Sequence, residues 1–497
     1  MPFVDTILKP FVAQCICSAS CNAFVLGEKE YTYADLAKGI AHHIRAFRLL
    51  EGQYVGIYVN EELPSYCAIW AAWFCGKTAV PIVHDALQER EALILSDCSP
   101  IDVIMPDADV VFDSFEDAID LMTTCLTAWG TDAQELIVLY TSGSTGTPKG
   151  APLSGMNLAA FYEAFRQTPY DWHAGDRCLQ LFDLSFDFSM LVYLPMWLAG
   201  GCIYGIPKGE MLTTYIYYLL TEKKLTILPI VPTLLNYLKP YFEELDCSDL
   251  RQLMVSGEPL PTDLVKAWYS QVPHGIIHNP YGPTECCMLS TTFSYPRDWV
   301  DERMGQWVSI GYLFSGMKGM VLNEVGEQVA FDTPGELYLS GPQVSSGYIN
   351  RDALNKEKFV YLMHEGEQQR FYRTGDWVIP RSDGRFDFVG RIDHQVKLKG
   401  GFRVELGEIE TVVERLVPQC ANRVVTIQNR IGNIEAVLIF ESVPFDTEAF
   451  KQQLQQALPW YMQPYAIYFL ANFPLNQNKK TSRPAMQLWA QQQYDLA

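Results

Sequence analysis

A loop rich in glycine and small hydroxyl residues could bind phosphate. The stretch YTSGSTGTPKG covers residues 140–150 and follows a predicted strand. Glycine lets the backbone approach a ligand closely, and backbone N–H groups and hydroxyls in such a loop can turn toward phosphate oxygens. The pattern is not the P-loop GxxxxGK[ST], because no Ser or Thr follows Lys149 directly. Taken alone, a loop of this composition is usually a solvated turn.

Seven further short motifs follow this loop, and most of them contain charged residues. Asp183, Glu285, Asp376, Arg391 and Lys480 each stand within one of them. A buried carboxylate needs a partner, and a lysine on a flexible stem suits an oxyanion whose position shifts during attack. The motifs are FDLS (182–185), NPYGPTE (279–285), GELYLSG (335–341), YRTGD (372–376), GRIDHQVKLKGGFRVELGEIE (390–410), LPWYMQP (458–464) and PLNQNKKTSR (474–483).

In this order the eight motifs resemble those of the adenylate-forming ligases, the superfamily of nonribosomal peptide synthetase adenylation domains, acyl-CoA synthetases and luciferases. The resemblance spans essentially the whole chain. Size and motif order are also similar to those of D-alanine–carrier protein ligase and of free-standing adenylation enzymes. The resemblance implies ATP and Mg²⁺ as cofactors.

The resemblance assigns roles within a nucleotide site. It implies that Tyr281 stacks on adenine, that Thr284 contacts the α-phosphate and that Asp376 anchors the ribose. Glu285 would hold Mg²⁺, a hard cation that prefers carboxylate and phosphate oxygens. The alternatives are a packed tyrosine, a surface carboxylate and an ion pair at a rim. The other implied nucleotide-binding residues are Thr141, Ser142, Gly143, Ser144, Thr145, Lys149, Gly257, Glu258, Asn279 near the base edge, Gly282, and Arg391 near the ribose and phosphate.

Lys480 stands at the position of the family's catalytic lysine, which reaches both the substrate carboxylate and the α-phosphate. This chain has NKK where the family usually has NGK, and the alignment sets Lys479 at the glycine. A second departure is the pair Gly400–Gly401, where the usual pattern has one glycine. This loop faces the active site when the small domain rotates to accept a thiol, so the register of Phe402 and Arg403 stays open.

FDLS is the motif that bears on substrate class. In family members that activate amino acids, an Asp at the position of Asp183 pairs with the α-ammonium, whereas ligases for fatty or aryl acids generally lack it. The alternative is a capping Asp before a helix. The resemblance therefore favours an amino acid as substrate.

The implied substrate pocket is mostly apolar and bulky, which suggests a restricted cavity. Asp187 is the exception: it follows Asp183 by four residues and, if that segment is helical, lies on the same face. It could receive a cationic or hydroxyl-bearing side chain, bond to protein groups or point to solvent. The pocket positions are Leu184, Asp187, Pro229, Met254, Ser256, Pro280, Met288 and Leu289.

The elements that must position these residues follow from hydrophobic patterning. Short apolar runs alternate with helical patterns and predict an α/β fold with mostly parallel sheets layered with helices. From about Val321, short strands with turns predict a β-barrel-like part, and a smaller α+β segment ends the chain. Predicted strands cover 135–140, 224–231, 251–257 and 274–281, and predicted helices cover 157–165 and 262–272.

The resemblance divides the chain into two domains. It implies a large N-terminal adenylation core over residues 1–391 and a mobile C-terminal lid over residues 392–497, with Asp393 as the hinge. The lid would carry Lys480. Its rotation would remove that lysine and open a tunnel for a thiol.

The charge balance restricts the partners. The 497 residues include 37 Lys and Arg against 58 Asp and Glu, a formal net charge of −21. This argues against nucleic-acid polymers and against polybasic membrane binding. We expect the acidity on the outer surface, a small positive interior, and a basic or apolar patch for a carrier protein.

Cysteine usage and the N-terminus bear on location. The thirteen scattered cysteines predict reduced thiols, and CICSASC (15–21) predicts packed helix thiols rather than a metal site. The sequence contains neither a signal-peptide pattern nor an apolar stretch that would insert into a membrane. We therefore expect a cytoplasmic protein.

These inferences predict a stand-alone amino-acid ligase. The amino acid would attack the α-phosphorus of Mg·ATP, pyrophosphate would leave, and the aminoacyl group would pass from its adenylate to a phosphopantetheine thiol. No GGxS-type carrier site and no HHxxxDG motif occur, so a carrier protein would act in trans. The alternatives are an acyl- or aryl-CoA ligase, which should not need Asp183, and a non-catalytic nucleotide-binding protein.

Overall fold

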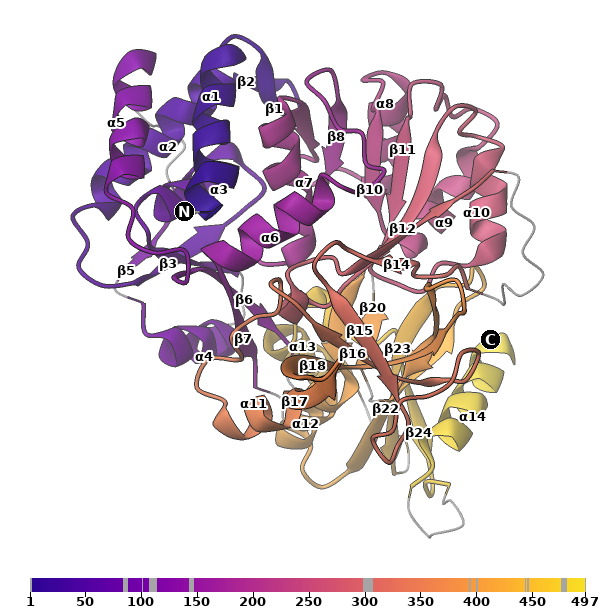
Figure 1. Ribbon diagram of the computed structural model, residues 1–497. Helices are drawn as coiled ribbons and strands as arrows, with labels where there is room; N and C mark the ends of the chain where they lie inside the picture. The colour runs from indigo at the N-terminus through magenta and orange to yellow at the C-terminus, as the bar shows by residue number, and fades with distance from the viewer. Residues whose placement is uncertain are drawn as a thin grey trace.

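The computed structural model describes residues 2–83, 88–100, 102–106, 114–142, 147–297, 307–392, 395–398, 401–442, 444, 447–474 and 481–496. Two sheets layered with helices fill the upper part of Figure 1, and the sheets formed by later parts of the chain lie below them. The helices are α1 (Lys9–Cys17), α2 (Tyr33–Phe47), α3 (Leu63–Phe74), α4 (Gln88–Cys98), α5 (Phe115–Thr127), α6 (Gly155–Phe165), α7 (Asp187–Ala199), α8 (Leu212–Thr221), α9 (Pro232–Leu238), α10 (Thr262–Tyr269), α11 (Asp352–Lys358), α12 (Leu406–Leu416), α13 (Glu448–Ala457) and α14 (Arg483–Leu496).

The largest sheet has nine strands among the described residues, in the order β14-β13-β12-β11-β10-β8-β9-β1-β2. From β12 to β1 the neighbouring strands run parallel, and every residue of β10 and β11 is buried. Burial on both faces explains the continuous apolar runs in the sequence. The strands are β1 (Asn22–Leu26), β2 (Lys29–Thr32), β8 (Arg177–Gln180), β9 (Cys202–Gly205), β10 (Ile227–Ile230), β11 (Gln252–Val255), β12 (Ile276–Tyr281), β13 (Thr291–Tyr295) and β14 (Tyr312–Leu313).

A five-stranded sheet of order β5-β3-β4-β6-β7 carries the predicted phosphate loop. The loop connects β6 and β7, which pair antiparallel so that Thr141 lies opposite Lys149. Both ends of the loop are therefore fixed by one hairpin. The strands are β3 (Tyr54–Val59), β4 (Thr78–Val83), β5 (Asp102–Ile104), β6 (Glu135–Thr141) and β7 (Lys149–Ser154).

The predicted barrel-like part is an antiparallel sheet of order β15-β16-β18-β17, with β19 paired to β18. The long strand β18 lies next to β19 in a register that sets Asp376 opposite Arg391. The strands are β15 (Lys318–Leu322), β16 (Gly335–Ser340), β17 (Phe359–His364), β18 (Glu367–Pro380) and β19 (Phe386–Arg391).

The C-terminal segment is a small α+β unit in the lower part of Figure 1. It combines a hairpin of β20 and β21, a sheet of order β22-β23-β24, and helices α12 to α14. Its apolar side chains form clusters separate from the main core. The strands are β20 (Gln395–Leu398), β21 (Phe402–Glu405), β22 (Ala421–Gln428), β23 (Ile434–Glu441) and β24 (Ala466–Leu470).

The predicted fold class is confirmed, and the predicted strands and helices correspond to β6, β10, β11, β12, α6 and α10. One detail is wrong. Cys15 is buried in α1, but Cys17 and Cys21 are exposed, because the helix ends at Cys17. All thirteen cysteines are free thiols.

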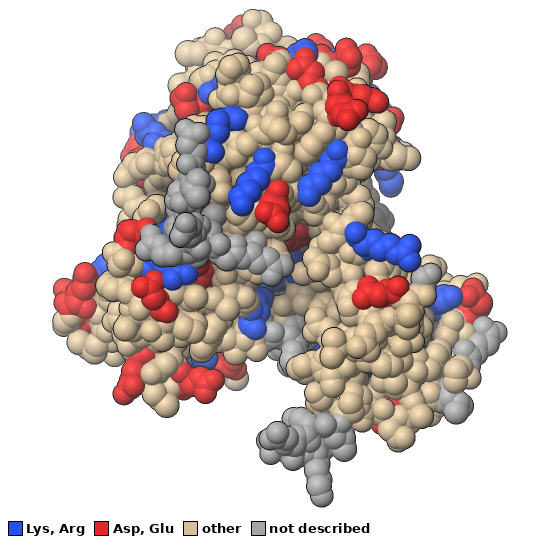
Figure 2. Space-filling view, turned by 90° about the vertical axis from the view of Figure 1, so that its right-hand side faces the viewer, with Lys and Arg blue, Asp and Glu red and all other residues tan. Residues whose placement is uncertain are grey.

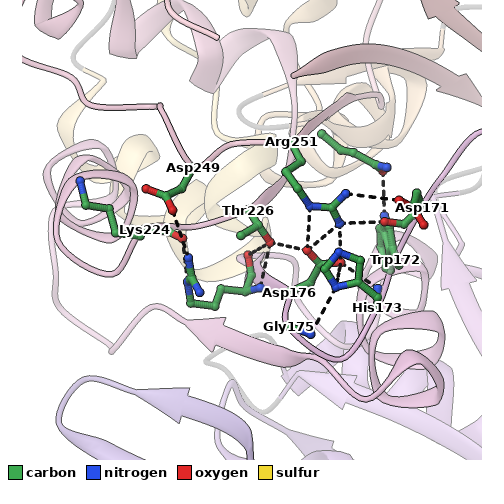
Figure 3. Close-up of polar contacts among 11 residues, drawn as sticks. Asp171, Trp172, His173, Gly175, Asp176, Lys224, Thr226, Asp249 and Arg251 are labelled. Atoms are coloured by element: carbon green, nitrogen blue, oxygen red, sulfur yellow. Dashed lines mark hydrogen bonds and ion pairs between the residues drawn. The ribbon is translucent and has the colours of Figure 1, made fainter. Parts of the chain in front are cut away.

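A buried carboxylate ties together three parallel strands at their N-terminal ends (Figure 3). Asp176, directly before β8, accepts hydrogen bonds from Arg251 Nη2 at 2.7 and 2.8 Å and from Thr226 Oγ1 at 2.7 Å. Arg251 directly precedes β11, and Thr226 directly precedes β10. The backbone N–H of His173 donates a further bond at 2.8 Å. This network fixes the spacing of the strand ends.

Replacing Asp176 with asparagine is expected to lower the free energy of unfolding by about 3 kcal/mol, because it removes the negative charge that pairs with Arg251. Urea denaturation measures this loss. The matched control is Asp171→Asn. The Asp171 carboxylate is 81% exposed and lies 3.6 Å from the same arginine, so removing its charge should lower the free energy of unfolding by less than about 1 kcal/mol. Equal losses in the two variants would contradict the assignment.

Candidate active site

A cavity of about 690 Å³ lies at the carboxyl ends of the parallel strands. Its wall includes residues that follow β8, β10 and β11, namely Asp183, Val231 and Ser256, together with Tyr281 at the end of β12. The opposite wall comes from β20 and β21 of the C-terminal unit. The carboxyl edge of a parallel sheet is the usual place for a ligand in α/β proteins.

Most of the described predicted site residues converge on this cavity. Those that line it are Thr141, Ser142, Asp183, Asp187, Ser256, Gly257, Glu258, Asn279, Pro280, Tyr281, Gly282, Thr284, Met288, Leu289, Asp376 and Arg391. Five others are buried outside its lining: Lys149, Leu184, Pro229, Met254 and Glu285. Gly143, Ser144, Thr145, Asp393 and Lys480 lie outside the described residues.

Glu285 is fully buried behind the cavity wall in a short 3-10 helix. Its Oε1 accepts a hydrogen bond from the Tyr348 hydroxyl at 2.5 Å and lies 3.9 Å from Lys149 Nζ. Its Oε2 lies 3.0 Å from Arg403 Nη1. Burial alone would raise the pKa of this carboxyl, but Arg403 and Lys149 outweigh it and hold the pKa well below its usual range.

Lys149 shares this cluster. Its ammonium lies 4.8 Å from the centre of the Tyr348 ring. Burial, reinforced by the nearby Arg403 guanidinium, lowers the pKa of Lys149 to about 8. A buried cation at the end of the phosphate loop suits an anionic ligand.

Arg403 is a site residue that the sequence did not assign. Its Nε donates to Gln395 Oε1 at 2.7 Å, and its carbonyl accepts from Ser142 Oγ at 2.9 Å. Gln395 in turn donates to Glu405. The side chain of Arg403 is thus held by its own hairpin, and its backbone carbonyl is held by the phosphate loop on the other side of the cavity.

Lys397 is a second unassigned cation in the cavity wall. In the β20–β21 hairpin it lies directly opposite Arg403. Burial lowers its pKa, while the nearby Asp376 carboxylate acts in the opposite direction. Both residues stand in the motif 390–410, whose loop was expected to face the active site, but no role was assigned to either of them and the register of Arg403 was left open.

Asp376 is held by residues from two different strands. Its Oδ2 accepts a hydrogen bond from the Tyr281 hydroxyl, and its Oδ1 accepts one from Arg391 Nη1 at 2.7 Å. The backbone N–H of Asp376 donates to Thr374 Oγ1 at 3.0 Å. Asp376 therefore contacts both Tyr281 and Arg391, the two residues that the resemblance assigned to the same nucleotide.

Asp183 and Asp187 both line the cavity, but they do not share a helical face. Helix α7 begins at Asp187, so Asp183 precedes it and the two carboxylates are not on one helical face. Asp183 Oδ1 accepts from the Ser185 N–H at 2.7 Å, a contact within the turn before α7, whereas the N-cap residue of that helix is Phe186. Burial raises the pKa of Asp187, and a hydrogen bond from Thr284 opposes this.

The tip of the β20–β21 hairpin fits closely against the large sheets. Gly401 has φ +91°, and a Cβ added to it would lie 2.8 Å from Val231 Cγ1. A Cβ added to Gly257, on the facing segment, would lie 3.8 Å from the Gly401 Cα. At position 401 only glycine satisfies both the backbone conformation and this approach.

Aromatic rings close the hairpin side of the cavity. Phe402 stacks on Tyr461 at 4.2 Å between ring centres and meets Phe186 edge-to-face at 4.7 Å. Trp460 packs edge-to-face on Phe402 at 5.2 Å. These four rings line the cavity and join the C-terminal unit to the segment after β8.

The cavity lining carries charged side chains of both signs. Lys149, Lys397, Arg391 and Arg403 lie in or beside the cavity. Figure 2 shows Asp and Glu side chains gathered at several places on the outer surface, with a hollow between the upper body and the lower right lobe. The expected positive interior is not found, because the cavity lining also includes the acids Asp183, Asp187, Glu258, Asp376 and Glu435.

The chain matches the family model described as AMP-binding enzyme over residues 17–349. The chain belongs to this family. It is an adenylate-forming domain of the kind found in nonribosomal peptide synthetases. Membership of this family supports its classification as an AMP-forming ligase that uses ATP.

Curated relatives of this AMP-binding enzyme are much longer. It is 31% identical to bacitracin synthase 3 of Bacillus licheniformis over 98% of this chain and 8% of that protein. It is 27% identical to enterobactin synthase component F of Escherichia coli O157:H7 over 97% of this chain and 39% of that protein. The chain thus spans well under half the length of these relatives.

A solved structure matches almost end to end. The adenylation domain AlmE of Vibrio cholerae, crystallised with glycyl-adenosine-5'-phosphate, is 26% identical with a TM-score of 0.84, covering 98% of this chain and 97% of that one. No helix among the described residues of this AMP-binding enzyme is long and apolar enough to span a membrane.

Proposed function

We propose that this AMP-binding enzyme activates an amino acid as its aminoacyl-adenylate and transfers it to a phosphopantetheine thiol of a carrier protein acting in trans. The observation that carries the proposal is the carboxylate of Asp183 in the wall of the same cavity as Thr284 and Asp376. An α-ammonium group needs such an anion when it leaves water. The glycyl-adenylate bound to AlmE supports the same substrate class.

In the first half-reaction the protein must position the carboxylate of the amino acid next to the α-phosphorus of ATP. We propose that Asp183 fixes the α-ammonium, Thr284 contacts the α-phosphate, and Asp376 holds the ribose. Lys149 contributes positive charge beside the phosphate loop. Alignment of two reactants in one water-poor site is worth several orders of magnitude in rate.

Glu285 suits Mg²⁺ by the chemistry of its donor atoms, since a hard cation prefers carboxylate oxygens and the phosphates it accompanies. The low pKa keeps this carboxylate ionised, and it lies beside the phosphate loop, as such a role requires. When bound, Mg²⁺ would neutralise charge on the triphosphate.

The second half-reaction requires the lid to turn. We propose that the core ends near Arg391, that Asp393 is the hinge and that the following residues form the lid, because their apolar clusters are separate from the main core. The β20–β21 hairpin reaches into the cavity here, with Arg403 on Glu285 and Gly401 against Val231. These contacts support the lid arrangement in which a thiol reaches the bound adenylate, rather than the arrangement in which ATP reacts with the amino acid.

The variant Gly401→Ala is expected to slow thioester formation about tenfold while leaving adenylation within about twofold, because the added Cβ meets Val231 only in this lid arrangement. Single-turnover transfer and ATP–pyrophosphate exchange measure the two steps separately. The control is Gly384→Ala, which has nearly the same positive φ but no atom within 4 Å of its Cβ. Slowing of both steps alike would contradict the proposal.

An assay that loads the amino acid onto a carrier protein tests this function. The protein, ATP, Mg²⁺ and an amino acid are incubated with phosphopantetheinylated carrier protein, and the carrier's mass is measured. A gain equal to the aminoacyl group, released by hydroxylamine, is expected. Transfer of an acid without an α-amino group to coenzyme A instead would replace this function by that of a CoA ligase.

A further inference from the structure

The carboxylate of Glu285 has two cationic neighbours but a single negative charge. Lys149 approaches Oε1 at 3.9 Å, while Arg403 approaches Oε2 at 3.0 Å. Oε1 also accepts the Tyr348 hydroxyl. Both oxygens therefore already have partners, and the closer of the two cations is the guanidinium of Arg403.

The two cations differ in origin. Lys149 belongs to β7 and lies next to the phosphate loop, so it stays beside Glu285 wherever the C-terminal unit lies. Arg403 belongs to β21, 118 residues further along the chain than Glu285. It reaches Glu285 only because the β20–β21 hairpin enters the cavity.

The hairpin presents Arg403 as a preformed unit. Gln395 accepts from the Arg403 Nε and itself donates to Glu405, so the planar guanidinium is held in orientation within its own hairpin. On the core side, Ser142 of the phosphate loop donates to the Arg403 carbonyl at 2.9 Å. The arginine thus contacts both the implied metal ligand and the implied phosphate loop.

We propose that Arg403 and Mg²⁺ compete for the carboxylate of Glu285, so that metal binding expels the β20–β21 hairpin and metal departure draws it in. This rests on the proposed function of the same site. A divalent cation and a guanidinium on one carboxylate repel each other strongly where water is excluded. After pyrophosphate and its metal leave, Lys149 at 3.9 Å is the counter-charge that the core itself offers to buried Glu285, and Arg403 then supplies a closer one at 3.0 Å.

Arg403 is therefore a positioning residue that couples the two half-reactions. It makes the lid arrangement depend on the occupant of Glu285 rather than on the thiol alone. The coupling is reciprocal, so removing Arg403 must strengthen metal binding as well as weaken docking of the hairpin.

Metal binding is measured directly with Mn²⁺, whose free form is counted by electron paramagnetic resonance, in the presence of α,β-methylene-ATP. Arg403→Gln is expected to bind Mn²⁺ about fivefold more tightly than the unsubstituted protein, because its competitor is gone. Arg430→Gln, which removes an exposed arginine of the C-terminal unit, is the matched control and should not change the affinity. Equal Mn²⁺ affinity in Arg403→Gln and the unsubstituted protein would overturn the inference.

Hydrogen exchange of residues 401–405 in the unsubstituted protein provides a second test that does not depend on a variant folding. Exchange is expected to rise when Mg²⁺ and the ATP analogue are added together and to stay low with the analogue and EDTA. An equal rise without metal would show that nucleotide alone expels the hairpin and would refute competition at Glu285. Failure of the proposed function would be seen in a different measurement. The unsubstituted protein would then show no amino-acid-dependent pyrophosphate exchange, whatever the metal affinities.

Discussion

Replacing Lys480 with alanine is expected to reduce amino-acid-dependent ATP–pyrophosphate exchange at least about a hundredfold. By resemblance this lysine contacts the attacking carboxylate and the α-phosphate, where charge changes during attack. Removing one preorganised donor of this kind typically costs about two to three orders of magnitude in rate. Exchange at saturating ATP and amino acid measures the loss.

The neighbouring residue provides a matched control. Lys479→Ala removes the same charge one position earlier, at the place where the family usually has glycine, and is expected to retain most of the exchange activity. A large loss in Lys479→Ala with activity retained in Lys480→Ala would mean that the alignment is off by one residue. The catalytic role would then belong to Lys479.

The second large effect is expected at Asp183. In Asp183→Asn the side-chain oxygen can still accept from the Ser185 N–H, so the turn contact at 2.7 Å is preserved while the charge is lost. Loss of the anion that pairs with a buried ammonium should raise the KM for the amino acid about a hundredfold or more. The KM for ATP and the free energy of unfolding should change little.

Asp183→Ala separates binding from structure, because it removes both the charge and the turn contact. If Asp183 serves only the turn, the alanine variant should lose stability while the asparagine variant keeps normal amino-acid kinetics. If it binds the substrate, both variants should lose amino-acid affinity. Urea denaturation and steady-state exchange kinetics on the pair distinguish the two cases.

Sequence patterning predicted the elements that carry the cavity. Continuous apolar runs identified β10, β11 and β12, because strands buried on both faces need no alternation. The motif residues at their carboxyl ends then had to meet, since parallel strands end at one edge of the sheet. This is why residues as far apart in the chain as Asp183, Ser256 and Tyr281 line one cavity.

What could not be predicted from the sequence depends on packing between distant segments. Arg403 and Lys397 stand in a recognised motif, yet their place in the cavity follows from how the β20–β21 hairpin meets Gly257 and Val231. Local periodicity carries no information on such a contact. The condition for a shared helical face of Asp183 and Asp187 is not met, because the segment from Asp183 forms a turn and α7 begins only at Asp187.

We propose that this AMP-binding enzyme activates an amino acid rather than another carboxylic acid. ATP–pyrophosphate exchange against a panel of amino acids, aryl acids and fatty acids distinguishes these substrate classes. We predict exchange with one or a few amino acids, reduced about a hundredfold or more in Asp183→Asn. Exchange with aryl or fatty acids alone, unaffected by that substitution, would contradict the claim.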